Sequence, residues 1–133
     1  MKKLYFVSLL FFCATLGFSQ DVESPAKSGN AFLRQCSIVE SGPHTEEEIF
    51  RANGCVLYIG GFVQGVEIAS TTVKVQNKMP TLPEPFCRPD HTESQQLVRI
   101  VLKYVRDNPE DAHRDTMFVA MWAFQKAFPC SGK

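Results

Sequence analysis

Hydrophobic residues after the N-terminal segment recur every three or four positions, which is the period of an amphipathic α-helix. The first such run covers residues 30–40. It ends at Gly42 and Pro43, because glycine accepts the left-handed conformation that follows a helix and proline cannot continue one. A second run starts at Thr45 and reaches residues 68–76, where a β-branched stretch favours the end of a helix but leaves a short extended segment open.

The second helix has a clear start signal. Thr45 and Glu48 stand at the spacing of a capping box, in which each side chain satisfies the backbone N–H of the other residue. Glu46 and Glu47 complete a first turn whose negative charge suits the positive end of the helix dipole. Apolar residues then follow at 3-4-3-4-3 spacing and predict the buried face of the helix: Ile49, Ala52, Val56, Ile59, Val63 and Val66.

Four glycines interrupt this helix: Gly54, Gly60, Gly61 and Gly65. Each costs about 0.5–1 kcal/mol relative to alanine inside a helix. A helix with several glycines therefore needs a compensating gain, such as the close approach of another backbone. That backbone could belong to the same chain or to a second copy, and Gly60, Gly61 and Gly65 are the candidate residues for either contact. A bend at Asn53-Gly54 is a further alternative.

Residues 77–92 are rich in proline and predict a loop. So long a loop in a small domain usually has a function or a tether, and Cys87 is the expected tether, with Phe86 turned inward. The next helix is expected to start with a second capping box, formed by Thr92 and Gln95, and to end near residue 107. Its buried stripe is predicted to contain Leu97, Val98, Val101, Tyr104 and Val105.

A last helix is expected to follow at once, with Asn108 as its N-cap, Pro109 in its first position and Pro129 beyond its end. Such a short connection predicts an antiparallel helical hairpin. The buried stripe of this helix is predicted to contain Met117, Met121, Phe124 and Phe128, widened by Phe118, Ala120 and Trp122. The whole pattern predicts an all-α fold, a small orthogonal or antiparallel bundle of about four to five helices.

Residues 1–19 have the three parts of a secretory signal peptide. Lys2 and Lys3 precede an apolar run, and small residues at Gly17 and Ser19 suit a cleavage site. Cleavage would leave a flexible lead-in, residues 20–29, and a helical domain, residues 30–131. A retained membrane anchor and a lipoprotein are the alternatives, although Phe11-Phe12 before Cys13 lacks the small residue that lipid attachment needs. No other stretch is expected to cross a membrane.

The charge balance limits the partners. Without Lys2 and Lys3 the chain has 12 basic residues against 14 acidic ones, a net charge of −2. A near-neutral domain of this kind is unlike a nucleic-acid-binding protein, and the sequence shows no polybasic patch for anionic lipid. We therefore expect neither nucleic acid nor, after signal cleavage, a membrane as the partner.

The cysteine count becomes even once Cys13 is removed, and an even number in an exported chain predicts two disulfides. Four cysteines allow three pairings. Cys87 precedes the third predicted helix and Cys130 follows the fourth, so an antiparallel hairpin would bring them together. The favoured pairing is therefore Cys87–Cys130, which leaves Cys36–Cys55 to join the first two helices.

Candidate chemistry is sparse. A catalytic cysteine needs a free thiolate and an activating histidine, but the thiols are expected to be oxidised, and His44, His91 and His113 lie among polar residues. Cys87 and His91 could form half of a zinc site, yet no second pair of ligands has suitable spacing. Glu67 is flanked by apolar residues but is more often a solvent-facing helix residue. The residues thus predict no catalytic site, no metal site and no cofactor.

Three segments together carry a family resemblance. The first is residues 55–66, Cys-Val-Leu-Tyr-Ile-Gly-Gly-Phe-Val-Gln-Gly-Val. The second joins Phe86-Cys87-Arg88-Pro89 to residues 95–104. The third runs from Asn108-Pro109-Glu110 to Ala127-Phe128-Pro129-Cys130. In this order they resemble the Rap/Tai family of type VI secretion immunity proteins over about residues 30–130.

The resemblance implies a helical periplasmic protein, often a homodimer, that binds a peptidoglycan amidase and blocks its active-site cleft. It implies no catalysis and no cofactor, so the chain is not expected to be an enzyme. Two exposed segments are the expected effector-binding candidates, namely the loop of residues 81–91 and the acidic start of the second helix. Their candidate residues are Arg88, Asp90 and His91 in the loop, and Glu46, Glu47 and Glu48 in the helix.

A second function has a similar size and layout, that of a periplasmic stress or acid chaperone-like protein without a dedicated effector. It predicts partial opening at low pH and binding of many clients. Three histidines and the lack of an evident buried acidic cluster make a pH switch the weaker expectation. An uncharacterised enzyme would need titratable groups gathered in a cleft, and the sequence predicts none.

Overall fold

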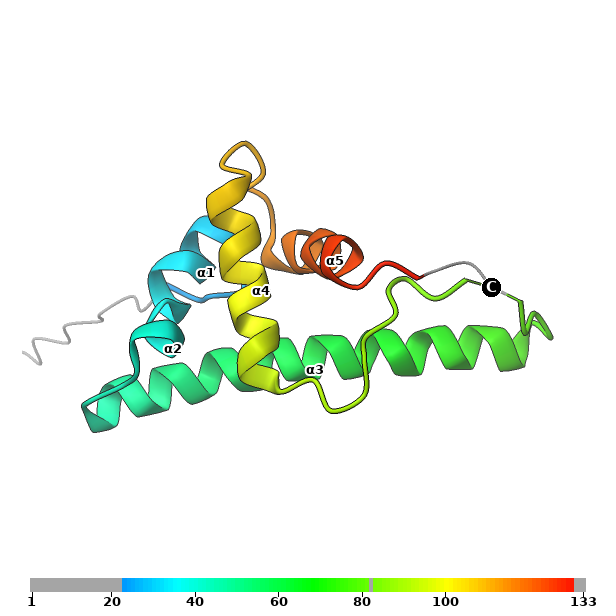
Figure 1. Cartoon of the computed structure of the whole chain (residues 1–133), viewed down its shortest axis with the longest axis horizontal. Coiled ribbons are helices and arrows are strands. Elements are labelled where there is room, and N and C mark those ends of the chain that lie inside the picture. The colour runs from blue at the N-terminus through cyan, green and yellow to red at the C-terminus, as the bar shows by residue number, and fades with distance from the viewer. Residues whose placement is uncertain (1–22, 82, 131–133) are drawn as a thin grey trace, which may run out of the picture.

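Five helical segments make up the fold of the computed structural model, which describes residues 23–81 and 83–130. The predicted signal peptide lies outside these residues. No β-strand occurs in the described part of the chain, which confirms the all-α prediction. The segments are α1 (Gly29–Cys36), α2 (Ile38–Ser41), α3 (Glu46–Gln76), α4 (Ser94–Asp107) and α5 (Thr116–Ala127). Helices α1, α2, α4 and α5 all lie on one side of the long helix α3 (Figure 1).

Helix α3 begins as the capping box predicts. Thr45 Oγ1 accepts a hydrogen bond from the Glu48 backbone N–H at 3.2 Å, and Glu48 Oε2 accepts from the N–H groups of Thr45 and His44. The helix continues without a break through Gly54 to Gln76, so the β-branched residues 68–76 are helical as favoured. Its 31 residues correspond to a rod about 46 Å long.

One side of α3 faces the core, as its apolar spacing predicts. Ala52, Cys55, Ile59 and Val63 are buried there. Ile49, which was expected on the same face, is 47 % exposed, because the first turn of α3 projects beyond α2 (Figure 1). The predicted apolar face is therefore correct from residue 52 onward and wrong at its first position.

The centre of the core lies between α3, α4 and α5. Phe124 of α5 is completely buried, and its ring centroid lies 5.3 Å from that of Phe86 and 6.3 Å from those of Phe62 and Phe128. The inward position of Phe86 confirms the prediction made for the loop. Helix α4 contributes five buried residues on one face: Leu97, Val98, Val101, Leu102 and Val105.

The predicted start of α4 is wrong in its capping chemistry. The helix begins at Ser94 with Glu93 as N-cap, and Glu93 makes no side-chain capping hydrogen bond. Thr92 instead donates its hydroxyl to the Pro89 carbonyl at 2.7 Å, which closes a turn in the preceding loop. The helix ends at Asp107 as expected.

The predicted start of α5 is also wrong. Asn108 ends α4, and its side-chain amide donates to the Tyr104 carbonyl. Turns then occupy the chain up to Asp115, which is the true N-cap and accepts from the Met117 N–H at 2.8 Å. The longer connection lets α5 run crosswise to α4, so the expected antiparallel hairpin is not formed (Figure 1).

This crosswise arrangement rotates α5 relative to the predicted buried stripe. Val119, Ala120, Ala123 and Phe124 are the buried apolar residues of the helix. Two residues that were expected in the core, Met117 and Phe118, are 51 % and 62 % exposed. Their exposure places two large apolar side chains on the surface at the start of α5.

Both favoured disulfides are present. Cys36–Cys55 joins α1 to α3 with a Cα–Cα distance of 5.7 Å, and Cys87–Cys130 joins the loop to the end of the chain with a Cα–Cα distance of 4.9 Å. The second pair meets by a route other than a hairpin. The loop after α3 turns back and passes the end of α5, where the Cys87 N–H donates to the Phe128 carbonyl at 2.9 Å.

An ion pair between α2 and α4 predicts a pH dependence of stability. Nη1 and Nη2 of Arg106 both contact the Glu40 carboxylate, and the hydrogen bonds from Arg106 lower the pKa of Glu40 below its ordinary value of 4.5. A lowered pKa stabilises the fold above pH 4.5, and this contribution is lost as the pH falls through the folded-state pKa. We expect Glu40→Gln to cost about 0.5 kcal/mol at pH 7, since both side chains are partly exposed, and less at pH 3, where more of the Glu40 carboxylate is protonated.

Urea denaturation at the two pH values measures this difference. Glu110→Gln is the matched control, because Glu110 is an exposed glutamate outside the ion pairs of the described residues. An equal loss of stability for Glu40→Gln at pH 3 and pH 7 would contradict the proposed role of the ion pair.

Candidate functional site

At the acidic start of α3, two of the three carboxylates are exposed and have no ion-pair partner among the described residues. Glu48 is committed to the capping box, and the hydrogen bonds from the His44 and Thr45 N–H groups lower its pKa. Glu46 and Glu47 are exposed on the first turn. These two residues are therefore the part of the predicted acidic candidate that can contact a partner.

A hollow of about 310 Å³ lies beside this turn, between α3, α1 and the segment before α1. Phe50 stands at its edge and is 82 % exposed, while Pro25 and the Cys55 end of a disulfide form its apolar wall. Arg51 also lines the hollow, and its Nε is buried without a hydrogen-bond partner within the described residues. The hollow thus combines an apolar surface with polar groups at its border.

The proline-rich loop is fastened along α3 by polar contacts. Arg88 Nε donates a hydrogen bond to Glu67 Oε1 at 3.0 Å, and Arg88 Nη2 forms an ion pair with the same oxygen at 2.9 Å. Glu84 accepts from Ser70 Oγ at 2.7 Å and also contacts the Lys74 ammonium group. Arg88 is therefore occupied in holding the loop, and Glu67, which was expected to face solvent, is its partner.

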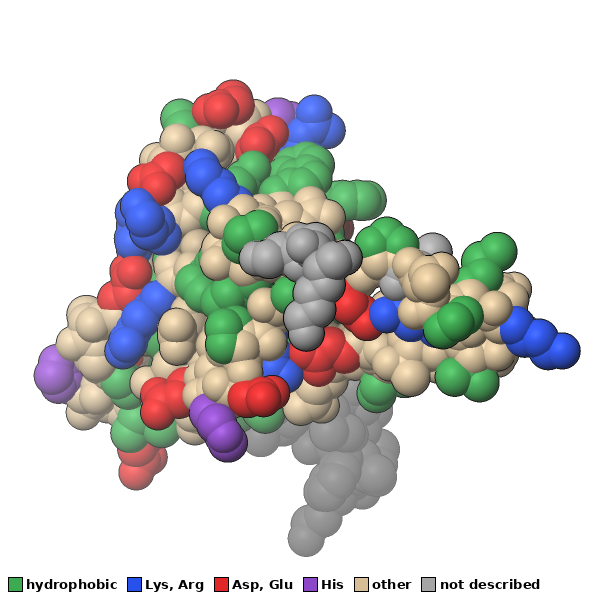
Figure 2. Space-filling view, turned by 45° about the vertical axis from the view of Figure 1, so that its right-hand side comes forward, with side chains coloured by type: hydrophobic (Ala, Val, Ile, Leu, Met, Phe, Trp, Pro, Cys, Tyr) green, Lys and Arg blue, Asp and Glu red, His purple; other side chains and the backbone are tan. Residues whose placement is uncertain are grey.

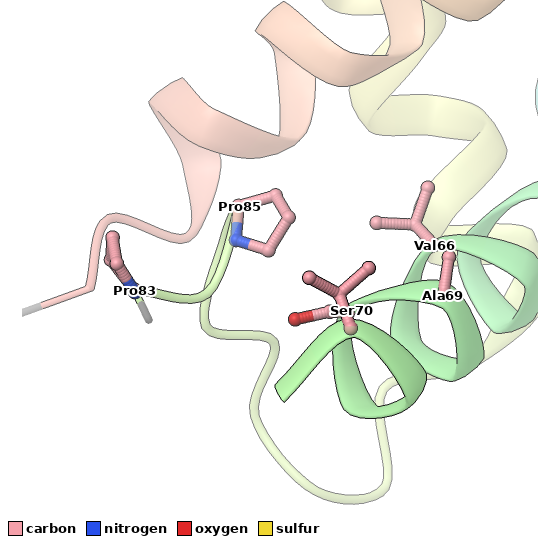
Figure 3. Close-up of a pocket in the computed structure, with 6 residues that line it drawn as sticks. Val66, Ala69, Ser70, Pro83 and Pro85 are labelled. Atoms are coloured by element: carbon pink, nitrogen blue, oxygen red, sulfur yellow. The ribbon is translucent and has the colours of Figure 1, made fainter. Parts of the chain in front are cut away.

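The same loop encloses a shallow hollow of about 260 Å³ against α3. Figure 3 shows Pro83 and Pro85 facing Val66, Ala69 and Ser70 across it. With the Cys87–Cys130 bond at one end and two ion pairs along its length, the loop is held at several points. It therefore presents a largely preformed surface.

Two of the predicted loop residues, Asp90 and His91, lie exposed at the turn that leads into α4. His91 has a positive φ of 63°, a conformation uncommon for residues other than glycine. Arg88 and Glu67 lie about 30 Å along α3 from Glu47. The structure thus separates the two predicted candidate groups instead of joining them into one site.

A third surface was missed by the sequence analysis. The Arg114 guanidinium lies 5.8 Å from the Trp122 ring centroid, and the Phe118 ring lies 6.4 Å from the same ring. These residues border a hollow of about 410 Å³ together with His113 and Asp115. Tryptophan and arginine often provide much of the binding energy at protein interfaces. We call Arg114, Phe118 and Trp122 the α5 aromatic patch.

The signal for this patch was present in the sequence. Phe118 and Trp122 are four residues apart, which places them on one side of α5, and Arg114 lies just before the N-cap of this helix. Phe118 and Trp122 were assigned to the core because they were taken to widen the predicted apolar stripe of the helix. In the structure Phe118 is 62 % exposed and Trp122 is half-buried, so the two rings form a partly exposed aromatic surface.

The arrangement offers little for catalysis. No group of three or more potential metal-ligating side chains occurs within residues 23–81 and 83–130. All four cysteines there are in disulfides, so no free thiolate exists among the described residues. What the structure presents is a crosslinked helical scaffold with aromatic, acidic and loop surfaces. These features define a small binding domain held in shape by two disulfides.

The comparison with family models gives the particular family. Residues 28–130 match the Rap1a immunity proteins, and the chain belongs to this family. The match spans every helix and all four disulfide cysteines, and it confirms the suspected resemblance. No curated protein and no solved structure matches the chain. Membership in a family of immunity proteins implies that the chain binds a cognate secreted effector protein.

Proposed function

We propose that this protein is a periplasmic immunity protein that binds and inhibits a peptidoglycan amidase delivered by type VI secretion. The family match over residues 28–130 is the observation that carries the proposal. The signal-like segment, residues 1–19, supports export, and two disulfides suit an oxidising compartment. The protein acts by blocking the active-site cleft of the effector and catalyses no reaction itself. It forms a homodimer.

A rigid scaffold suits tight inhibition, because surfaces that are already ordered lose little conformational entropy on binding. The disulfides and the ion pairs of the loop order this chain before it meets a partner. The α5 aromatic patch adds side chains of the type that dominates binding energy at interfaces. We therefore place the inhibitory contact at the α5 aromatic patch.

Co-expression tests the function directly. The full chain is produced in the periplasm together with the hydrolase encoded by the adjacent gene, and both cell lysis and digestion of purified peptidoglycan are measured. We expect a stable complex and loss of hydrolysis at equimolar inhibitor. If the chain neither binds nor inhibits a cell-wall hydrolase, the proposed function is wrong.

A charge placed in the α5 aromatic patch is expected to weaken this complex. Phe118→Glu should raise the dissociation constant for the effector about tenfold to a hundredfold, since an exposed aromatic anchor is replaced by a solvated carboxylate. Gln125→Glu is the matched control, because Gln125 is an exposed residue of the same helix and its change adds the same charge. Isothermal titration calorimetry compares the two variants.

Equal affinities for Phe118→Glu and Gln125→Glu would move the inhibitory contact away from the α5 aromatic patch. The loop tip at Asp90 and His91 and the free carboxylates Glu46 and Glu47 would then be tested by the same calorimetry. Inhibition by the unaltered chain decides the function separately from this location.

A further inference from the structure

The side of α3 that faces away from the other helices has an unusual composition. Several large apolar side chains on this side are exposed to solvent. Their exposed fractions are 82 % for Phe50, 75 % for Leu57, 67 % for Ile68 and 73 % for Val75. Two glycines lie between them on the same side, because all six positions are spaced by multiples of about 3.6 residues. We call these six residues the outer stripe: Phe50, Leu57, Gly61, Gly65, Ile68 and Val75.

No other described segment packs closely against the glycines of the outer stripe. A Cβ atom at Gly61 or Gly65 would meet no atom within 4 Å. At Gly60 it would lie 3.7 Å from Ser94 Oγ, an ordinary contact that alanine could make. Close packing inside one chain, one of the two explanations for these glycines, is therefore not observed in the described residues. Close approach of a backbone from outside is the explanation that is left.

By length and composition alone, α3 could cross a membrane, and its exposed apolar side chains contribute to this composition. The expectation that no stretch after residue 19 has this property is thus wrong. A bilayer is nevertheless a poor match for α3, because ion pairs of Glu67 and Lys74 hold the loop on this helix and a disulfide joins it to α1. A second protein surface suits the outer stripe better.

The glycines and the large apolar residues of the outer stripe are arranged almost symmetrically about the middle of the stripe. Gly61 and Gly65 flank a midpoint at residue 63, with Leu57 and Ile68 next and Phe50 and Val75 at the ends. A two-fold axis at the midpoint would place the glycines of two copies against each other. It would also place Leu57 of one copy near Ile68 of the other, and Phe50 near Val75. Such self-complementarity is what an isologous dimer requires.

The charges at the ends of α3 select the direction of a second copy. Glu46 and Glu47 carry free carboxylates at the start of the helix, and the exposed Lys78 follows its end. An antiparallel pair brings the carboxylates of one copy towards Lys78 of the other, and the two helix dipoles also oppose each other favourably. A parallel pair would place carboxylates against carboxylates. In Figure 2, hydrophobic side chains cover much of the projecting end of α3, and lysine or arginine marks its tip.

We propose that a second copy of this chain packs on the outer stripe, with the two α3 helices antiparallel and crossing at Gly61 and Gly65. The inference rests on the homodimer in the proposed function and assigns its interface, independently of the effector. It leaves the α5 aromatic patch of both copies outside the dimer contact, so that each copy can bind an effector.

Sedimentation equilibrium of the mature chain and three variants tests the surface. The unaltered chain is expected to be a dimer, and Leu57→Glu should raise the dimer dissociation constant by at least about a hundredfold, since both copies lose an apolar contact and gain a charge. Gly61→Ala should raise it about tenfold. Met117→Glu is the control, because Met117 is an exposed apolar residue of α5; its dimer should be unchanged.

The glycine variant has a second readout that a merely local role would not produce. Gly61→Ala should raise the melting temperature at concentrations where the protein is monomeric, because alanine favours the helix and its Cβ meets open space within the chain. A more stable monomer that dimerises less well marks the position as a contact between two backbones.

Spin labels attached through unnatural amino acids, which leave the disulfides intact, test the direction. For an antiparallel pair, labels at residue 47 of the two copies lie about 48 Å apart, whereas labels at residue 64 lie close to the axis. A parallel pair brings both label pairs within about 20 Å. A short distance at residue 47 overturns the antiparallel arrangement, and a dimer that survives Leu57→Glu overturns the interface.

A chain that stays monomeric overturns the homodimer itself, while the inhibition assay still decides the effector function. In that case, flotation with phosphatidylglycerol vesicles shows whether lipid occupies the outer stripe instead. Vesicle binding that is lost in Leu57→Glu would assign the stripe to a membrane surface, which also overturns the proposal.

Discussion

Replacement of Phe124 by alanine is expected to lower the free energy of unfolding by about 3–5 kcal/mol, the usual cost of removing a phenyl ring from a core. Phe124 is completely buried and touches rings from α3, the loop and the end of α5. Those neighbours come from three parts of the chain, so they cannot all collapse into the cavity. Urea denaturation followed by circular dichroism measures the loss.

Phe118→Ala provides the matched control for this prediction. It removes the same ring from the same helix, but Phe118 is 62 % exposed, so we expect a loss below about 1 kcal/mol. The contrast between the two variants isolates burial as the cause. Similar losses at the two positions would mean that the rotation of α5 described here is wrong and that the sequence-predicted stripe, with Phe118 inside, is correct.

Local signals in the sequence predicted the first half of the fold well. Gly42 has a φ of 82° at the end of α2, and the capping box of Thr45 and Glu48 starts α3. Each of these signals acts through backbone groups within four residues, so the sequence around it contains the whole cause. The disulfide pairing was also predicted, although the loop reaches Cys130 by its own path.

The start of α5 could not be predicted in this way, because distant residues decide it. Asn108 and Asp115 are both good N-cap residues, and local propensity does not choose between them. The turns between them are held by hydrogen bonds from the start of α1, where the Gly29 N–H donates to the Arg114 carbonyl and the Asn30 N–H to the Ala112 carbonyl. These contacts join segments about eighty residues apart.

The surroundings of the candidate site residues also depend on distant contacts. Arg88 was expected to be free for a partner, but it binds Glu67, and this contact exists only because the loop folds back along α3. Phe118 and Trp122 of the α5 aromatic patch were assigned to the core because they widened the predicted apolar stripe, whereas Phe118 is 62 % exposed. Side-chain type predicted which residues could bind, whereas exposure depended on the path of the chain between helices.

Loss of the Cys36–Cys55 disulfide, through a double change to alanine, is expected to lower the free energy of unfolding by about 4 kcal/mol or more. The bond closes a loop of 19 residues, which contributes about 3 kcal/mol on the chain-entropy model. Both cysteines are almost fully buried, so the two missing sulfur atoms also leave a small cavity that costs about 1 kcal/mol further. Thermal and urea denaturation measure the sum.

The second disulfide provides a comparison for this prediction, because it closes a longer loop but lies at a more exposed position. Cys87–Cys130 spans 43 residues, for which the same model gives about 4 kcal/mol. Both cysteines are exposed, however, and the bond ties a loop to the last described residue of the chain. Its removal lets the loop open locally while the helices stay folded, so the global loss of stability should be smaller than for Cys36–Cys55.

Hydrogen exchange separates the two cases. Without Cys87–Cys130, exchange is expected to rise for the amides of the loop and of residues 128–130, among them the Cys87 N–H that donates to Phe128. Without Cys36–Cys55, exchange should rise throughout α1, α3 and α4, because these helices share one core. A larger global loss for the Cys87–Cys130 variant would mean that chain entropy alone sets both contributions and that burial of the first bond adds nothing.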